Sequence, residues 1–201
     1  MMTGAHLQEQ TRKVFWGELA PCDHVLQIYD EDKVFLDSLQ GFICEGLDAG
    51  EAVIIIATAS HREEMSRRLT LAGHDVDGLA ASDRYIALSA QDTLDQFMVR
   101  GAPDEARFRR TINGVVERAR RGGRGVRAFG EMVALLWARG NRASTVQLEL
   151  MWNDLLRSQR FPLFCAYPRV GFTQEISSAI HAVCEAHTRI FGESQARAAG
   201  A

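Results

Sequence analysis

The sequence lacks the features of an exported or membrane-spanning protein. Its longest apolar run, residues 52–57, is far shorter than the ~20 residues of a membrane-spanning helix. The first residues are polar, so they provide no apolar core for a secretory signal. The cysteines are far apart and form no CxxC pair, which in a chain without an export signal indicates reduced thiols. We therefore expect a cytoplasmic protein that does not bind membranes.

Motifs for nucleotide hydrolysis and for the common enzyme mechanisms are also missing. The chain has no P-loop, no GxSxG, no HExxH and no GxGxxG after a strand. In the turn YDEDKVFLDS, acids stand where phosphate would lie, and Lys33 is not followed by Ser or Thr. The glycine-rich GGRG at 122–125 follows a predicted helix, so it is interpreted as a helix stop. We expect no hydrolysis at this turn and no cofactor.

The composition is that of a soluble globular domain. Apolar residues make up 46% and charged residues 24% of 201 residues, and the net charge is −3. A chain of this size buries a sufficient core without disulfides or metals, and nothing in its overall charge indicates nucleic acid. We expect an N-terminal arm over 1–20, a single domain over 21–191 and a flexible tail over 192–201.

Strand-like and helix-like patterns alternate along the chain. Short apolar runs predict strands at 24–29, 52–57, 85–90, the start of 125–137, and 161–168. Helical spacing of apolar residues predicts helices over 31–47, 58–73, 92–98, 101–121, 142–158 and 173–191. Asp92 is the predicted N-cap of the third helix. This order predicts an α/β fold with three layers, in which helices flank both faces of a mostly parallel sheet.

Such sheets bind ligands at the carboxyl ends of their strands, and polar and aromatic residues gather near the expected edge. Glu149 and Asn153 lie one turn apart on a helix, and Cys165 and Tyr167 share one face of the last strand. Acids among aromatics beside a turn that cannot hold phosphate predict a small-molecule pocket. The candidate ligand-binding residues are His24, Tyr29, Phe129, Glu131, Trp137, Glu149, Trp152, Asn153, Cys165 and Tyr167.

Each candidate taken alone has a simpler interpretation. His24 would lie in solvent at a strand start, Glu131 would cap a helix, and the tryptophans would be core. A metal site is also considered, because His181, Cys184 and His187 are spaced by three on one predicted helix. His187 shares the apolar stripe of that helix, however, so a core histidine is favoured and no metal site is predicted.

The stretch 100–127 is rich in arginine. It holds nine arginines against Asp104, Glu105 and Glu117, and its one aromatic residue, Phe108, falls on the apolar stripe. A nucleic-acid surface would interleave aromatics with the basic residues, so direct binding of nucleic acid is not expected. A solvated helix face is favoured, and a docking face for an acidic protein is the second interpretation.

Several blocks resemble the MEDS domain, the sensory domain of DcmR-like regulators in methylotrophs and methanogens. They are DHVLQIYD, GLDAGEAVIIIAT with His61, FMVRGAPDEARF, VRAFGEMVALLW, LELMWNDL, LFCAYP and VCEAH, and they cover roughly 20–190. The resemblance implies a RecA/KaiC-like fold that has lost nucleotide hydrolysis and senses small organic molecules such as hydrocarbon derivatives. The residues at its motif positions are His24, Glu131, Trp137, Glu149, Trp152, Asn153, Cys165, Tyr167, Cys184 and His187.

Three functions follow from these patterns. The first is a non-catalytic sensory module in signal transduction. MEDS domains occur fused to DNA-binding domains, histidine kinases or anti-sigma-type modules, and this chain has no room for one. Its signal would therefore pass to a partner kinase, anti-sigma factor or transcription regulator, or through formation of a homo-oligomer. The second is a degenerate NTPase domain kept as a protein-interaction scaffold. The third is an enzyme with Glu131 as general base or Cys165 as nucleophile, although no motif pairs a base with a nucleophile.

Overall fold

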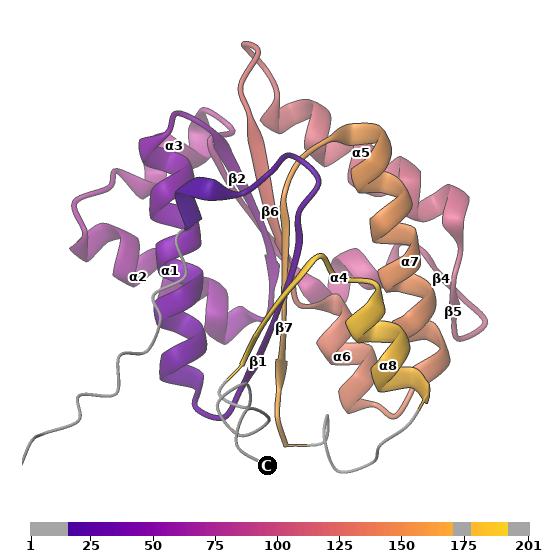
Figure 1. The fold of residues 1–201 in the computed structure, drawn as a ribbon. Coiled ribbons are helices and arrows are strands. Elements are labelled where there is room, and N and C mark those ends of the chain that lie inside the picture. The colour runs from indigo at the N-terminus through magenta and orange to yellow at the C-terminus, as the bar shows by residue number, and fades with distance from the viewer. Residues whose placement is uncertain (1–15, 171–177, 193–201) are drawn as a thin grey trace, which may run out of the picture.

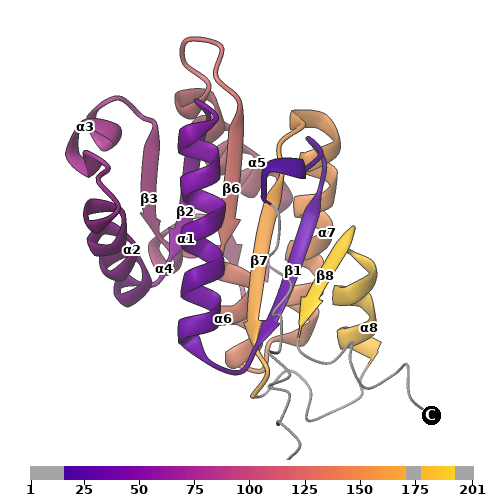
Figure 2. The same cartoon turned by 60° about the vertical axis from the view of Figure 1, so that its left-hand side comes forward.

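A sheet of six parallel strands runs through the middle of the molecule (Figure 1). The computed structural model describes residues 16–170 and 178–192. The strands are β1 (His24–Tyr29), β2 (Ala52–Ala57), β3 (Tyr85–Ser89), β6 (Val126–Gly130), β7 (Leu163–Pro168) and β8 (Arg189–Gly192). Figure 2 shows them side by side in the order β3-β2-β6-β7-β1-β8. The predicted three-layer α/β fold is confirmed.

Helices cover both faces of the sheet (Figure 1). One layer contains η1 (Trp16–Glu18), α1 (Asp32–Asp48), α2 (Ala59–Leu71) and α3 (Val76–Ala81). The other contains α4 (Ala90–Asp95), α5 (Glu105–Ala119), α6 (Met132–Ala138), α7 (Arg142–Gln159) and α8 (Ser178–Glu185). A hairpin of β4 (Met98–Val99) and β5 (Ala102–Pro103) precedes α5. No helix in the described ranges is long and apolar enough to cross a membrane.

The two faces of the sheet bury two separate apolar cores, because side chains alternate along each strand. In β7, Leu163, Cys165 and Tyr167 pack into the core under α4–α8. Phe164 and Ala166 pack into the core under α1 and α2. The central β2 is buried along its whole length, as its continuous β-branched sequence AVIIIA predicts. The sheet therefore divides the interior into two compartments.

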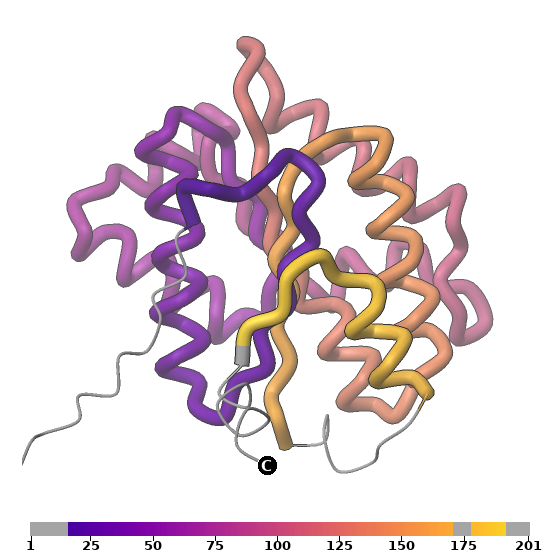
Figure 3. The backbone as a smooth tube through the Cα atoms, in the orientation of Figure 1, coloured from indigo at the N-terminus to yellow at the C-terminus, as the bar shows by residue number. Residues whose placement is uncertain are grey.

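The C-terminal part of the fold differs from the sequence prediction. The helix expected over 173–191 is described from Ser178 only, ends at Glu185, and is followed by β8. Ile190, assigned to the helical stripe, instead pairs with Leu26 of β1. The first and last described strands lie side by side (Figure 3). The four-residue edge strand RIFG has too few apolar residues to leave a period that differs from that of a helix.

Smaller differences concern caps and short elements. Ser89, not Asp92, is the N-cap of α4, and its Oγ accepts the N–H of Asp92 at 3.2 Å. The short α3 and the β4–β5 hairpin were not predicted. The glycine-rich turn does end α5, because Gly122 and Gly123 have φ values of +78° and +76°, which favour glycine.

A buried arginine connects α1 to the sheet. Arg127 of β6 is only 4% exposed, and its Nε donates to Glu51 Oε2 at 2.5 Å. Its Nη1 donates to the carbonyl of Phe42 at 2.9 Å, so the guanidinium is held from two sides. Gly46 lies directly over this side chain, where a Cβ would overlap it. The absence of a side chain at Gly46 is what lets Arg127 reach α1.

We expect Gly46→Ala to lower the free energy of unfolding by about 1–3 kcal/mol, because the added methyl overpacks a side chain held in place. Gly114→Ala is the matched control: it lies in the exposed face of α5 with open space around it, and should raise stability by about 0.5–1 kcal/mol. Urea unfolding of both variants measures the contrast. Equal stabilisation by the two substitutions would show that Arg127 is not fixed as described.

Candidate functional site

The residues predicted to form one ligand site fall into two groups on opposite faces of the sheet. His24, Glu149, Asn153, Cys165 and Tyr167 meet between the sheet and the helices α7 and α8. Tyr29, Phe129 and Glu131 lie on the other face, toward α1 and α2. The expectation of a single site at the carboxyl edge is therefore wrong, because strand alternation places a layer of backbone between the groups.

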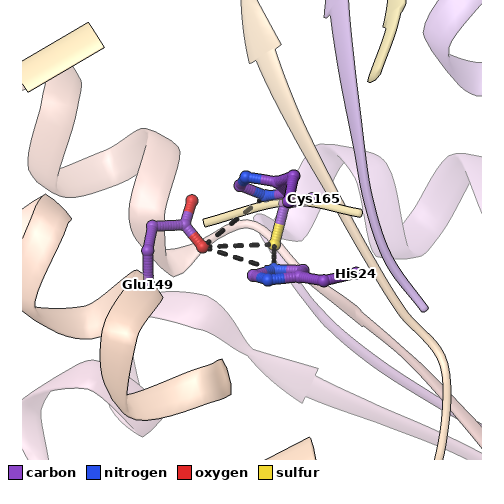
Figure 4. Close-up of side chains that lie close together, drawn as sticks. His24, Glu149 and Cys165 are labelled. Carbon is purple, nitrogen blue, oxygen red and sulfur yellow. Dashed lines mark hydrogen bonds and ion pairs between the residues drawn. The ribbon is translucent and has the colours of Figure 1, made fainter. Parts of the chain in front are cut away.

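The first group surrounds a carboxylate that is wholly removed from solvent. Glu149 of α7 is 0% exposed, and its Oε1 accepts a 2.6 Å hydrogen bond from the Tyr167 hydroxyl. Its Oε2 lies 3.4 Å from His24 Nε2 and 3.7 Å from His187 Nε2. Figure 4 shows the Cys165 sulfur close to both Glu149 and His24, so that the three groups form a triangle. We call these residues the buried cluster: His24, Glu149, Asn153, Cys165, Tyr167 and His187.

Hydrogen bonds fix the orientation of both imidazoles in the buried cluster. His24 Nδ1 lies 2.9 Å from Asn153 Oδ1 and 3.2 Å from the carbonyl of Ala186. Asn153 Nδ2 donates to that same carbonyl at 2.8 Å, which sets the direction of its amide. His24 Nδ1 therefore faces two acceptors and carries the proton, so the lone pair of a neutral ring is on Nε2.

His187 has the same arrangement. Its Nδ1 donates to the carbonyl of Val183 at 2.6 Å, which leaves the lone pair on Nε2. That Nε2 is buried and has no hydrogen-bond partner among the described residues. The two rings lie against each other at an interplanar angle of 34°, with their centroids 3.9 Å apart.

Burial sets the protonation of the cluster. Burial lowers the pKa of His187 to about 4, against the attraction of Glu149, so this ring is neutral at pH 7. Burial and the Glu149 carboxylate raise the pKa of Cys165 and of Tyr167 well above their usual range. Burial acts to raise the pKa of Glu149, but attraction to the imidazoles when they are protonated and the hydrogen bond from the Tyr167 hydroxyl lower it, so the net direction favours the carboxylate. A charge is thus held in the interior.

The two tryptophans occupy core positions rather than the walls of a pocket. Trp137 is 5% exposed and packs edge-on against Tyr167, with centroids 6.0 Å apart. Trp152 is 1% exposed and packs edge-on against Phe108 at 5.0 Å. The simpler interpretation of these residues, core packing, is the one that the structure supports.

A surface groove of about 300 Å³ borders the buried cluster. Asn153 and His187 line it, and both also belong to the cluster. Leu156 and Ala186 give it an apolar part, whereas Arg157 and Glu185 contribute opposite charges. The groove is therefore separated from Glu149 by only one layer of side chains.

The second group lies at the carboxyl ends of β2 and β6. Glu131 follows β6, and its Oε2 accepts the backbone N–H of Thr58 at 2.8 Å. Its Oε1 lies 2.9 Å from His61 Nδ1. Glu131 thus caps the start of α2 rather than its own helix. Neither Thr58 nor His61 was among the predicted site residues, and the position of His61 in a quoted motif block was the one available signal.

The turn after β1 places Asp30 and Glu31 immediately before α1, and Asp32 in its first turn. A helix N-terminus attracts anions, but here it already faces carboxylates. Arg169 donates from Nε to both oxygens of Asp30, at 2.8 and 2.9 Å. The turn is therefore acidic, as the sequence indicates.

Several arginines of the stretch 100–127 make contacts within the domain. Arg118 and Arg121 both pair with Asp83, at 2.7 and 3.2 Å. Arg120 donates to Gln159, and Arg127 is the buried residue that holds α1. These contacts weaken the interpretation of the stretch as a docking face.

The His61–Glu131 pair predicts a specific pH dependence of stability. The Glu131 carboxylate, aided by Asp32, raises the pKa of His61, while burial opposes the shift. The folded state therefore holds this proton more tightly than an unfolded histidine, whose pKa is about 6.5. The stabilisation is fully present below that pH and is lost as pH rises through the folded pKa.

We therefore expect His61→Gln to remove a decline in the free energy of unfolding on the alkaline side of pH 6.5. His181→Gln, on the exposed side of α8, is the control and should keep the wild-type profile. Urea unfolding between pH 6 and 9 measures both. A His61→Gln profile that parallels wild type would contradict the pairing.

Comparison with known proteins shows the family of the chain and a similar fold. The family model named MEthanogen/methylotroph, DcmR Sensory domain (MEDS) matches residues 23–188. A KaiC-like protein from the hyperthermophilic archaeon Pyrococcus horikoshii has a similar structure, with a TM-score of 0.60 and 15% identity over 85% of this chain and 71% of that chain. At that identity the likeness shows the fold alone. No curated protein matches. The family match spans most of the chain and indicates a sensory role: the chain belongs to the MEDS family of sensory domains.

Proposed function

We propose that this domain is a non-catalytic sensor that binds a small organic molecule in the groove beside the buried cluster. The proposal rests on Asn153 and His187, because both residues line the groove and both belong to the buried cluster. A molecule that contacts either side chain changes the surroundings of a buried charge. Such a charge responds strongly, because the interior screens it poorly.

The size and lining of the groove favour a small hydrocarbon derivative. A volume of about 300 Å³ is at the lower end of the range for ligand pockets. Leu156 and Ala186 suit a short apolar chain, and Asn153 and Arg157 provide donors for one polar group. An alcohol, haloalkane or short organic acid has this combination.

Two observations support binding rather than catalysis. The Cys165 thiol is fully buried and its pKa is raised well above the usual range, whereas a nucleophilic cysteine needs a lowered pKa and access to substrate. Glu131 is already engaged by the Thr58 N–H and by His61, so it is not an available general base.

The segment after α8 offers a route for the signal. Ala186 and His187 connect α8 to the edge strand β8, and the Thr188 N–H donates to the carbonyl of His24 at 2.8 Å. A ligand that shifts His187 displaces this edge toward or away from β1. A partner kinase, anti-sigma factor or transcription regulator, or a second copy of the domain, would read the displacement, with a coupling of about 1–3 kcal/mol.

A thermal-shift screen with two arms tests the proposal. One arm holds small alcohols, haloalkanes, organic acids and aromatic metabolites, and the other holds Mg-ATP, Mg-GTP and their diphosphates. A ligand at ~100 times its Kd adds about 2.7 kcal/mol, which shifts the melting temperature by several degrees. We expect shifts in the first arm alone. Shifts with nucleotides, or with nothing, would overturn the proposal in favour of a divergent NTPase or a scaffold.

The substitution Asn153→Ala tests whether the ligand binds in the groove. This substitution removes the amide that lines the groove and contacts His24, so we expect at least tenfold weaker binding of any organic hit. Asn113→Ala, on α5 and outside the groove, is the matched control and should bind like wild type. Titrations monitored by tryptophan fluorescence give both affinities. An unchanged affinity in Asn153→Ala, with the fold intact by circular dichroism, would place the ligand elsewhere.

A further inference from the structure

Four electron-pair donors converge inside the buried cluster. We call them the donor set: His24 Nε2, Glu149 Oε2, Cys165 Sγ and His187 Nε2. They come from β1, α7, β7 and the segment between α8 and β8. All four atoms lie within 4.8 Å of one another, and all four residues are buried. No spacing rule in the sequence links these positions.

The donor set has more inward-facing lone pairs than hydrogen atoms that could bond to them. Both Nδ1 atoms carry the ring protons, so each Nε2 directs a lone pair inward. Glu149 Oε2 is a carboxylate oxygen, and the Cys165 thiol has a single proton to share. His187 Nε2 has no hydrogen-bond partner among the described residues, although it is buried. Buried acceptors of this kind are normally paired, so an electron-pair acceptor is missing from the centre.

The separations fit tetrahedral coordination. Zinc bonds of about 2.0–2.3 Å at a tetrahedral angle put neighbouring ligand atoms about 3.3–3.7 Å apart. His24 Nε2 lies 3.4 Å from Glu149 Oε2 and 3.4 Å from Cys165 Sγ. Glu149 Oε2 lies 3.7 Å from His187 Nε2 and 3.9 Å from Cys165 Sγ. These four separations therefore lie within or slightly above the tetrahedral range, and all four donor atoms stay within 4.8 Å of one another.

The surrounding contacts are those of a supported metal site. The Nδ1 atom of each imidazole faces away from the centre and is hydrogen-bonded to an amide or carbonyl oxygen, which fixes the orientation of the ring. The second oxygen of Glu149 is held by the Tyr167 hydroxyl. The charges also balance, because a thiolate and a carboxylate neutralise a divalent ion. Without an ion, the cluster buries an unbalanced carboxylate, which is costly.

We propose that the donor set binds one divalent transition-metal ion of the zinc class. Two imidazoles, one thiolate and one carboxylate suit Zn²⁺, and the same set takes Co²⁺ or Cu²⁺. On binding, the Cys165 thiol loses its proton to solvent as the metal–sulfur bond forms, and no electron is transferred. The ion ties β1, α7 and β7 to the start of β8. This inference goes beyond the sensory proposal, because the ion is bound whatever occupies the groove.

The full chain, stripped of metal with a chelator and then titrated with Co²⁺, tests the site directly. We expect ~1 ion per chain by elemental analysis, intense visible bands of four-coordinate cobalt, and a near-ultraviolet thiolate-to-metal band. X-ray absorption of the zinc form should show one sulfur and three lighter ligands. These readouts use wild type, so they hold even if a variant fails to fold. No bound ion, or six-coordinate cobalt without a sulfur ligand, would overturn the proposal.

Matched substitutions assign the ligands. Cys165→Ser should abolish the thiolate band, and His187→Gln should reduce the intensity of the visible bands at least severalfold. Cys44→Ser, on α1 across the sheet, and His181→Gln, on the exposed side of α8, should leave both unchanged. A Cys165→Ser spectrum identical to wild type would disprove the site.

The metal proposal and the sensory proposal fail separately. The organic arm of the thermal-shift screen is run on chelator-treated and on zinc-loaded protein. Ligand shifts in both forms without stoichiometric metal binding would leave the sensor standing and remove the ion. Stoichiometric metal binding without any ligand shift would do the opposite.

Discussion

Glu149 lies in the interior under α7 and α8, and its buried charge is the constraint that the polar groups around it have to meet. A carboxylate removed from water destabilises the folded state unless polar groups replace its hydration. Tyr167 replaces part of it from β7, whereas the two imidazoles, at the start of β1 and in the segment after α8, approach the carboxylate through nitrogens that carry lone pairs and donate no hydrogen bond to it. An apolar residue at this position would pack at no such cost. A buried charge here accordingly costs stability that an apolar residue would not.

The sheet separates two kinds of chemistry. On one face, Glu131 and His61 form a nearly buried pair that fixes the start of α2. On the other, the buried cluster is sealed except where His187 and Asn153 reach the groove. Carboxyl-edge sites are the usual expectation for a parallel sheet. Here the denser set of polar groups lies beside the amino end of β1 and the middle of β7, under α7 and α8.

The sequence predicted the elements far better than the way they meet. The alternation in LFCAYP placed Cys165 and Tyr167 on one face, and helical spacing placed Glu149 and Asn153 one turn apart, as the structure has them. Both are local patterns set by backbone periodicity. His187 was assigned to a helix with His181 and Cys184, whereas α8 ends at Glu185, so the three-residue spacing says nothing about its partners. Those partners lie in β1, α7 and β7, and only the order of strands in the sheet brings them together.

The position of β1 between β7 and β8 has a consequence for how the chain matures. His24 pairs across to Leu163, and Val25 to Arg189, so β1 acquires its two neighbours from segments that are synthesised well after it. Contacts that close such long loops form late and slowly. The strands β2, β3 and β6 can pair with one another earlier, whereas β1 pairs only after β7 and β8 have been synthesised. An occupant that requires His24 and His187 together therefore binds only after synthesis has reached His187, and discriminates a nearly complete domain from a shorter nascent one.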